Sequence, residues 1–200
     1  MMNLEDYKTV FAAMGLIGVL LFASPALSLV VHLPGGEKFS ELWVLGPEHT
    51  AAGYPFNVSA DVSYLVYVGV GNHVGESAYY SVEVKLRNET DDLPNVTVDA
   101  PSPLPSLYEY RLFLQDGQSW EESLNFSFLQ VSTGQNTSMV GGVTVNGVTV
   151  GVYKPNVWDE ENGGYFYELF MELWIYNVTS DAFQYNNRFV GLYLDMTGTL

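Results

Sequence analysis

A stretch of 24 residues without one charged side chain, Val10–Leu33, is the feature that most constrains this sequence. A helix of about 20 apolar residues crosses the hydrocarbon core of a bilayer, which is roughly 30 Å thick. A cleaved signal peptide would instead need a basic leader and a small-residue cleavage site. Residues 1–9 hold two acidic side chains and one lysine, and apolar residues continue beyond the candidate cleavage site Ser24–Ala26. We therefore expect residues 10–33 to be a retained transmembrane anchor in the lipid bilayer, with a cleaved signal segment as the alternative.

Six Asn-x-Ser/Thr triplets follow this stretch, none with proline in the middle. The chain has 13 Asn, and 26 of its 200 residues are Ser or Thr, so chance alone predicts about two such triplets. The alternative is that Asn and Thr accumulate in the turns of any β protein. Such triplets accept glycans only on the outer side of a membrane. We expect a single-pass protein of the cell membrane with an extracellular C-terminal domain and N-linked glycans on Asn57, Asn88, Asn95, Asn125, Asn136 and Asn177.

The chain carries few basic side chains. Seven Lys and Arg stand against 23 Asp and Glu, which gives a formal net charge of −16. A protein that binds along phosphates needs a basic surface, so nucleic-acid binding is excluded. The same scarcity argues against a polybasic patch for anionic lipid heads. No cysteine is present, so disulfides cannot stabilise an exported domain and its apolar core must do so alone.

Beyond residue 34 the apolar side chains recur with a period of two, which is typical of strands with one buried face. Three segments show this alternation: Tyr80–Arg87, Tyr108–Leu114 and Leu124–Phe128. Asn125 falls on the outward face of the third segment, where a glycan has room. Tyr64–Val70 is apolar on both faces and is therefore expected to be a central strand.

The dipeptide Asn146-Gly147 lies between two valine-rich segments. It predicts a two-residue hairpin of type I′, because both central residues of that turn need positive φ. Val145 should then face Val148, and Val143 should face Val150.

Three further segments complete the predicted order of elements. Tyr165–Tyr176 alternates like a strand, although Glu168 and Glu172 are also four residues apart, as on one side of a helix; its aromatic content favours the strand. Asp91–Ser106 contains four prolines and is expected to be a long loop. Arg188–Met196 is expected to be the last strand.

Many short strands separated by turn signals predict an all-β fold, an antiparallel immunoglobulin-like β-sandwich preceded by one N-terminal transmembrane helix. The expected organisation is an N-terminal tail over residues 1–9, the anchor over residues 10–33 and one extracytoplasmic β-sandwich domain over residues 34–200.

No combination of residues points to a catalytic, cofactor or metal site. The third glycine of Gly69–Gly75 comes one place late for a dinucleotide-binding motif, and a strand follows instead of a helix, so a turn between paired strands is the better interpretation. His32, His49 and His73 are far apart in the sequence. The Gly-x-Ser-x-Gly signature of serine hydrolases is absent. We therefore expect no enzyme and no cofactor.

The segment Asp159–Asn162 gathers three carboxylates and an amide before two glycines. Hard oxygen ligands of this kind can hold Ca²⁺. The alternating ligand spacing of a dedicated calcium loop is missing, so an acidic surface turn is the preferred interpretation.

Several ordered stretches resemble one known family: Phe39–Pro47, Tyr54–Val58, Tyr67–Tyr80, Val84–Thr90, Ser102–Arg111 and Phe183–Leu192. They are similar to the extracytoplasmic part of an archaeal membrane-protein family known as domain of unknown function sixteen-sixteen. Members often carry several transmembrane helices before this domain, whereas one is predicted here. The resemblance implies an archaeal cell-surface setting, and it implies no catalytic residues, since the family has no assigned activity.

These features predict a non-enzymatic, glycosylated surface domain that acts as an interaction or accessory subunit of a membrane or envelope complex. Its partners would be other membrane or envelope proteins. One alternative is a strand-exchanging subunit of an extracellular filament, which requires cleavage near Ala26 and a free strand over Phe39–Leu45. A second alternative is a carbohydrate- or Ca²⁺-binding module.

Overall fold

The computed structural model describes residues 7–8, 10–19 and 37–197 of the chain. They belong to two compact units, Met1–Glu37 and Lys38–Leu200. In the first unit, residues 7–8 and 10–19 are helical. None of the described residues forms a helix with the length and apolarity that a membrane crossing requires. Most of the anchor predicted over residues 10–33, including Ser24–Ala26, lies outside the described residues.

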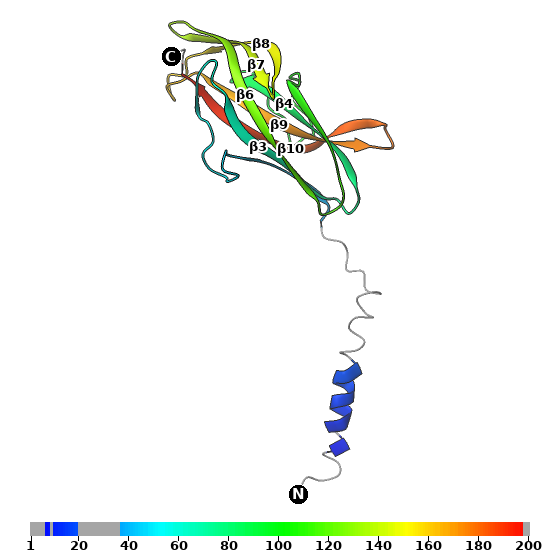
Figure 1. The fold of residues 1–200 in the computed structure, drawn as a ribbon. Helices are drawn as coiled ribbons and strands as arrows, with labels where there is room; N and C mark the ends of the chain where they lie inside the picture. The colour runs from blue at the N-terminus through cyan, green and yellow to red at the C-terminus, as the bar shows by residue number, and fades with distance from the viewer. Residues whose placement is uncertain (1–6, 9, 20–36, 198–200) are drawn as a thin grey trace. The chain divides into compact units, whose positions relative to one another are not determined.

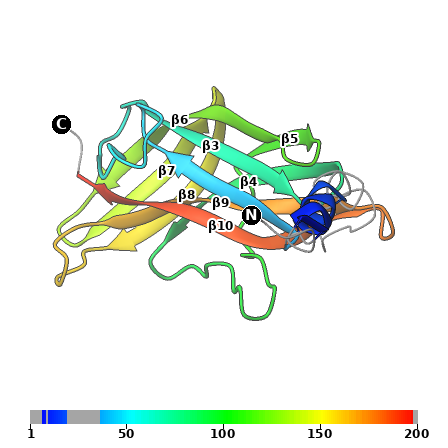
Figure 2. The same ribbon diagram turned by 90° about the horizontal axis from the view of Figure 1, so that it is seen from below.

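The second unit consists mainly of strands, which form two five-stranded sheets (Figures 1 and 2). The first sheet has the order β1-β3-β6-β7-β8 and the second has the order β2-β10-β9-β4-β5. These strands pair antiparallel, apart from a short parallel contact between β2 and β10. The mainly β, antiparallel architecture predicted from the period-two pattern is confirmed. The strands are β1 Phe39–Leu45, β2 Asn57–Val58, β3 Tyr64–His73, β4 Ala78–Asn88, β5 Tyr108–Leu114, β6 Ser119–Thr133, β7 Thr137–Val145, β8 Val148–Val157, β9 Phe166–Asn177 and β10 Ala182–Met196.

Both sheets contribute side chains to one hydrophobic core. Its members occupy alternate positions, because successive side chains of a strand point to opposite faces. Each buried apolar side chain stabilises the fold by about 1.5–3 kcal/mol relative to full exposure. Among the most deeply buried are Val66, Val68 and Val70 of β3, Tyr80, Val82 and Val84 of β4, Leu124, Phe126 and Phe128 of β6, and Leu169, Met171 and Leu173 of β9.

The predicted Asn146-Gly147 hairpin is confirmed. Asn146 and Gly147 have φ of 46° and 82°, and Val145 pairs with Val148 while Val143 pairs with Val150. Both residues therefore adopt the positive φ that a type I′ turn requires.

Three other predictions are confirmed with modified boundaries. The segment Tyr165–Tyr176, whose pattern has features of both a strand and a helix, corresponds to strand β9, which pairs with β4 and β10 on its two sides. Tyr64–Val70 belongs to β3, which lies between β1 and β6. The last strand is longer than predicted: it begins at Ala182 and contains a register shift between Tyr185 and Arg188.

The interpretation of Gly69–Gly75 as one turn is wrong in part. Gly69 and Gly71 lie within β3, and the turn that follows the strand contains Gly75, whose φ is 83°. A Cβ at Gly69 would stand 2.1 Å from Cε2 of Trp43, so this glycine makes room for the indole of the neighbouring strand. That strand, Phe39–Leu45, pairs with β3 along its whole length, whereas the filament alternative requires it to be free.

The proline-rich loop between β4 and β5 buries part of the outer face of the second sheet. The Lys85 ammonium lies 2.7 Å from Oε2 of Glu172 and 3.1 Å from Oε2 of Glu83. The Lys85 and Glu172 side chains are only 3% and 0% exposed. The loop residue Ser102 donates its main-chain N–H to Glu172 (2.7 Å), and its carbonyl accepts from Lys85 (3.2 Å). The loop thus completes a buried ionic network on a face that the sequence pattern marks only as polar.

Candidate functional site

The predicted glycan acceptors differ in accessibility. Asn125 lies on the outward face of β6, as its place in the alternation predicted. Asn177 is half-buried in the β9–β10 hairpin, which projects from the sheets (Figures 1 and 2), and it donates its amide N–H to Gln184 (3.0 Å). Asn88 is buried. The exposed acceptors are Asn57, Asn95, Asn125 and Asn136.

The side chain of Asn88 serves as a structural bridge at the end of β4. Its Nδ2 donates to the carbonyl of Pro155 in β8 (2.7 Å). Its Oδ1 accepts from the main-chain N–H groups of Thr90 and Asp91, each at 3.0 Å. The nitrogen that a glycan would modify is therefore engaged within the folded domain.

The histidines do not converge. His49 stacks on Tyr67 with 3.7 Å between ring centroids, and its Nδ1 lies 2.6 Å from a Glu121 carboxylate oxygen. His73 stacks on Phe39 at 4.8 Å. His32 lies outside the described residues. The described parts of the chain contain no group of three metal-ligating side chains.

In the acidic turn Asp159–Asn162, the Asp159 carboxylate accepts hydrogen bonds from other residues of the same turn. Asp159 accepts hydrogen bonds from the Asn162 side chain (2.6 Å) and from the main-chain N–H groups of Glu161 (2.8 Å) and Asn162 (3.1 Å). These bonds, above all the one from the Asn162 side chain, lower the pKa of Asp159. The carboxylate thus orders its own turn.

Strand β8 forms one edge of the first sheet and pairs there with β7. Its first six residues, Val148–Tyr153, include no charged side chain, and no side chain in the described part of the chain bonds to their main chain. Val148 and Tyr153 are 49% and 73% exposed. We call the unpaired side of Val148–Tyr153 the open edge.

From Val152 onward, β8 carries features that usually protect an edge strand from further pairing. Val152 and Tyr153 lie opposite the single residue Gly141, which makes a β-bulge, and Tyr153 has a φ of 47°. Lys154 and Pro155 follow. The Lys154 carbonyl accepts a hydrogen bond from the Tyr167 hydroxyl (3.2 Å), as the Pro155 carbonyl does from Asn88. The bulge therefore lies in the last two residues of the open edge, and the hydrogen bonds that cover the main chain of β8 begin just beyond it, at Lys154.

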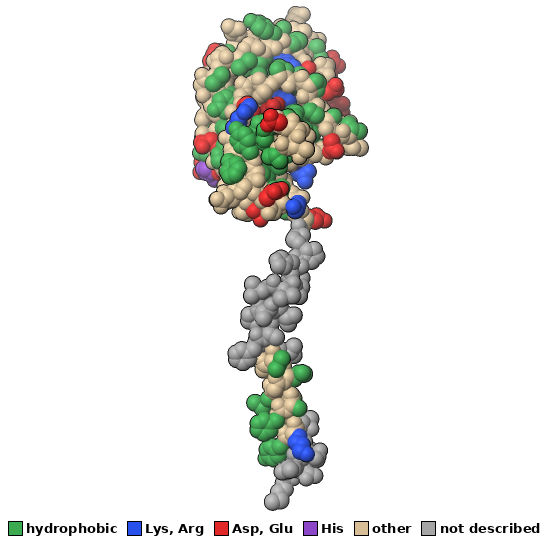
Figure 3. Space-filling model, turned by 90° about the vertical axis from the view of Figure 1, so that its right-hand side faces the viewer, with side chains coloured by type: hydrophobic (Ala, Val, Ile, Leu, Met, Phe, Trp, Pro, Cys, Tyr) green, Lys and Arg blue, Asp and Glu red, His purple; other side chains and the backbone are tan. Residues whose placement is uncertain are grey.

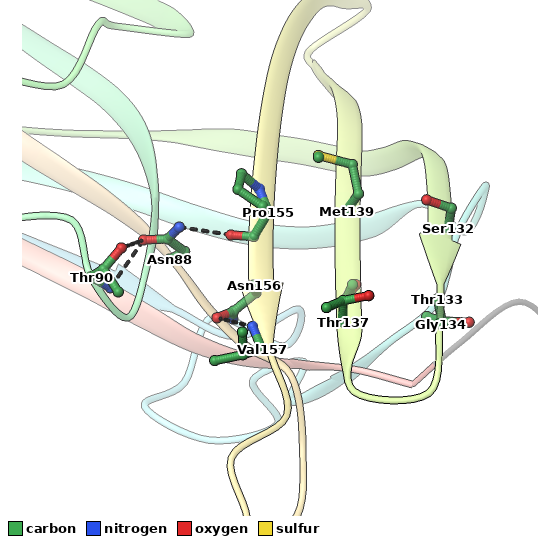
Figure 4. Close-up of a pocket in the computed structure, with 11 residues that line it drawn as sticks. Asn88, Thr90, Ser132, Thr133, Gly134, Thr137, Met139, Pro155, Asn156 and Val157 are labelled. Atoms are coloured by element: carbon green, nitrogen blue, oxygen red, sulfur yellow. Dashed lines mark hydrogen bonds between the residues drawn. The ribbon is translucent and has the colours of Figure 1, made fainter.

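A hollow of about 660 Å³ lies at the protected end of β8. Figure 4 shows Asn88 and Thr90 on one side of β8 and the β6–β7 residues, such as Met139, on the other. Among the described residues, those that line it have no ionisable side chain. The Asn156 amide is engaged, because its Nδ2 donates to the Phe166 carbonyl (2.5 Å). This hollow offers hydroxyl groups and apolar surface.

A second hollow, of about 720 Å³, lies at the other end of β8. We call it the β5–β6 cleft, since residues of both strands and of the β7–β8 turn line it. The lining residues are Tyr108, Glu109, Tyr110 and Arg111 of β5, Trp120, Glu122, Ser123 and Asn125 of β6, and Asn146 and Gly147 of the turn.

The side chain of Asn146, in the β7–β8 turn, forms hydrogen bonds with residues of β5 and β6 that line the β5–β6 cleft. Asn146 donates its side-chain N–H to the Tyr110 hydroxyl (2.7 Å), which donates to the Ser123 carbonyl (2.8 Å). Its Oδ1 accepts from the main-chain N–H of Asn125 (2.9 Å). Burial raises the pKa of the Tyr110 phenol, and the Asn146 hydrogen bond offsets part of that rise. Tyr110 is therefore a neutral hydrogen-bonding group that fixes the turn against β5 and β6.

The open edge and the cleft are absent from the sequence predictions, because they depend on which strands end up at the edges of the sheets. One signal was present in the sequence. Alternate residues of a strand share a face, so Glu122 is expected on the same face as Leu124, Phe126 and Phe128, where it interrupts the apolar pattern.

The family model described as Domain of unknown function (DUF1616) matches residues 33–139, and the chain belongs to this family. The family description names no activity. No curated protein matches the sequence.

Solved structures show only distant likeness. A beta-glucosidase from Listeria innocua in complex with isofagomine is 11% identical with a TM-score of 0.40, and the match covers 82% of this chain and 17% of that chain. This chain thus spans less than a fifth of the enzyme. PapD-like domain 7 of human CEP192 is 8% identical with a TM-score of 0.30, covering 85% of this chain and 94% of that one. Scores this low assign no activity.

Proposed function

We propose that this chain is a membrane-anchored, N-glycosylated archaeal surface protein whose immunoglobulin-like β-sandwich binds a protein partner. In this role it is a non-enzymatic accessory subunit of a membrane or envelope complex. The observation that carries the proposal is the open edge of β8, Val148–Tyr153.

An uncharged, unpaired strand edge suits the addition of a strand from another protein. In such β-augmentation the main-chain hydrogen bonds supply affinity, and neighbouring hollows select the side chains. The open edge meets the β5–β6 cleft at Gly147, and the protected end of β8 lines the other hollow at Pro155. A bound segment would thus find a hollow near each end of β8.

The setting of the proposed function rests on the sequence. The uncharged segment over residues 10–33 has the length of an anchor, and the exposed Asn57, Asn95, Asn125 and Asn136 can present glycans. Figure 3 shows acidic side chains spread over one face of the domain with basic ones among them, and in the whole chain 23 Asp and Glu outnumber seven Lys and Arg. Such a surface favours solubility outside the membrane.

The hydrogen-bond pattern of β8 defines a sharp test. Val145 and Val148 flank a two-residue turn and form a hydrogen-bonded pair, so the next pair, Thr144 and Thr149, is not hydrogen-bonded. The N–H of Thr149 therefore points to the open edge. Thr149→Pro deletes this donor and keeps the ladder to β7, whereas Thr149→Val keeps the donor.

The experiment captures the tagged full chain from its native membranes in a mild detergent and identifies the proteins that co-purify. We expect a partner that the parent and Thr149→Val retain and that Thr149→Pro loses at least about ten-fold. Thermal unfolding of each variant checks that it is folded, and Thr149→Lys replaces the proline variant if that one is not. Equal capture by all folded variants would rule out the open edge as the docking site.

A further inference from the structure

The β5–β6 cleft contains a carboxylate where the strand otherwise presents apolar side chains. Leu124, Phe126 and Phe128 are buried in the core, and the same alternation gives Glu122 their face of β6. Glu122 is exposed within the cleft. In the described part of the chain its carboxylate forms no ion pair, and it accepts one weak hydrogen bond, from the main-chain N–H of Ser123 (3.3 Å).

Three aromatic rings line the same cleft as this carboxylate. Tyr108 and Tyr110 meet edge to face at 4.9 Å between centroids, and Tyr110 and Trp120 do so at 5.2 Å. Tyr110 is buried, and Tyr108 and Trp120 are half-buried. The faces of such rings carry partial negative charge and attract cations within about 6 Å.

The other charges of the cleft compensate one another. Arg111 pairs with Glu109 at 3.0 Å, and the Arg111 guanidinium also lies 5.2 Å from the centroid of the Phe183 ring. Glu122 is therefore the uncompensated charge of the cleft among the described residues. The net charge of −16 adds a long-range attraction for positive groups.

We propose that the β5–β6 cleft binds an arginine side chain of the protein partner, with its guanidinium against Glu122 and the rings of Trp120 and Tyr108. Arginine suits this cleft better than lysine, because its planar guanidinium stacks on aromatic rings and bonds a carboxylate through two N–H groups. The inference rests on the proposed function and names the chemistry of the partner.

The cleft and the open edge meet at the β7–β8 turn. Gly147 lines the cleft, and Val148, the next residue, begins the open edge. The volume of about 720 Å³ exceeds the needs of one guanidinium, so part of the backbone that carries it also fits. One extended segment can therefore pair with β8 and place an arginine in the cleft.

The test uses the full chain in detergent micelles and follows the indole N–H signal of Trp120 by NMR. The probes are Nα-acetyl-arginine methylamide, the lysine equivalent and the citrulline equivalent, which has nearly the shape of arginine without its charge. We expect arginine to shift the Trp120 signal most strongly and citrulline to bind at least about ten-fold more weakly. The discrimination should shrink as salt is added, since the cleft is open to solvent.

Two variants localise the effect. Glu122→Gln keeps the shape of the side chain and should remove the preference for arginine over citrulline. Glu160→Gln, in the acidic turn at Asp159, removes the same charge elsewhere and should leave the preference unchanged. Equal binding of arginine and citrulline to the parent, or an unaltered preference in Glu122→Gln, would overturn the inference.

Failure of this inference and failure of the proposed function are distinguishable. If partner capture depends on Thr149 but is the same in Glu122→Gln and the parent, the result supports docking at the open edge and rules out the arginine site. If the probes discriminate but Thr149→Pro captures as well as the parent, the cleft binds arginine and the strand addition at β8 is wrong.

Discussion

The outer face of β4 and β9 and the open edge of β8 both carry polar groups that need partners. The rest of the described chain provides those partners on the outer face but not at the open edge. On the outer face, the loop residue Ser102 seals the ion pair of Lys85 and Glu172. At the open edge, the main chain of Val148–Tyr153 has no such cover within the described residues. A polar group that is hydrogen-bonded or ion-paired within the fold contributes to stability. A polar group left unpaired at the surface is available to a binding partner.

This comparison predicts where substitutions act. Changes beneath the loop should lower the free energy of unfolding, because a buried charge that loses its partner keeps its desolvation penalty. Changes at the open edge should leave unfolding nearly unaltered and affect association.

Glu172→Gln should destabilise the domain by about 3 kcal/mol, since it leaves the buried Lys85 with Glu83 as its remaining carboxylate partner. Denaturant unfolding of the full chain measures the change. The double variant Lys85→Met with Glu172→Leu removes both charges and should recover most of the loss. A loss below about 1 kcal/mol in Glu172→Gln would mean that the loop does not seal this pair.

Gly147→Val should cost about 2 kcal/mol, because it forces a β-branched residue to adopt positive φ. Gly147→Asn is the matched control, since asparagine tolerates this conformation better. The same unfolding measurement applies. If the valine variant proves as stable as the parent, the turn that joins the cleft to the open edge has a different geometry.

Asn88→Gln should cost about 1.5 kcal/mol through the lost bridge to Pro155 and the turn at Thr90. It should not change the glycan mass of the native protein, because Asn88 is engaged within the fold. Intact mass spectrometry checks this, with Asn125→Gln as the control that should remove one glycan. A glycan found on Asn88 would show that this bridge does not form in the native protein.

Neutralising Asp159, Glu160 and Glu161 together should change the thermal midpoint least, because exposed carboxylates of a turn contribute little. Millimolar Ca²⁺ should not raise the midpoint of the parent, since Asp159 already bonds within its own turn. A calcium-dependent rise that the triple variant loses would instead make this turn a metal site.

The sequence predicted those parts of the molecule whose signals are local. The Asn146-Gly147 turn, the loop over Asp91–Ser106 and strand β9 follow from turn chemistry, proline content and alternation, which act over a few residues. Alternation also placed Asn125 outward correctly.

The parts that the sequence did not predict depend on contacts between distant segments. Lys85 has the position of an outward charge in the sequence, and its burial against Glu172 depends on a distant strand. The hydrogen bond from Asn88 to Pro155 likewise joins distant segments, so no local pattern predicts it. The open edge requires the strand order of a whole sheet. Glu122 alone gave a local sign of the candidate site, because it interrupts the apolar face of β6.

Amide hydrogen exchange at Thr149 tests the central claim most directly. Its N–H points to the open edge, whereas those of Val148 and Val150 bond to β7. In the purified full chain, the Thr149 amide should exchange rapidly and its two neighbours slowly. In the complex isolated from native membranes, Thr149 should become protected while the ladder amides of β4 and β9 stay unchanged. Rapid exchange of Thr149 in that complex would contradict strand addition at β8.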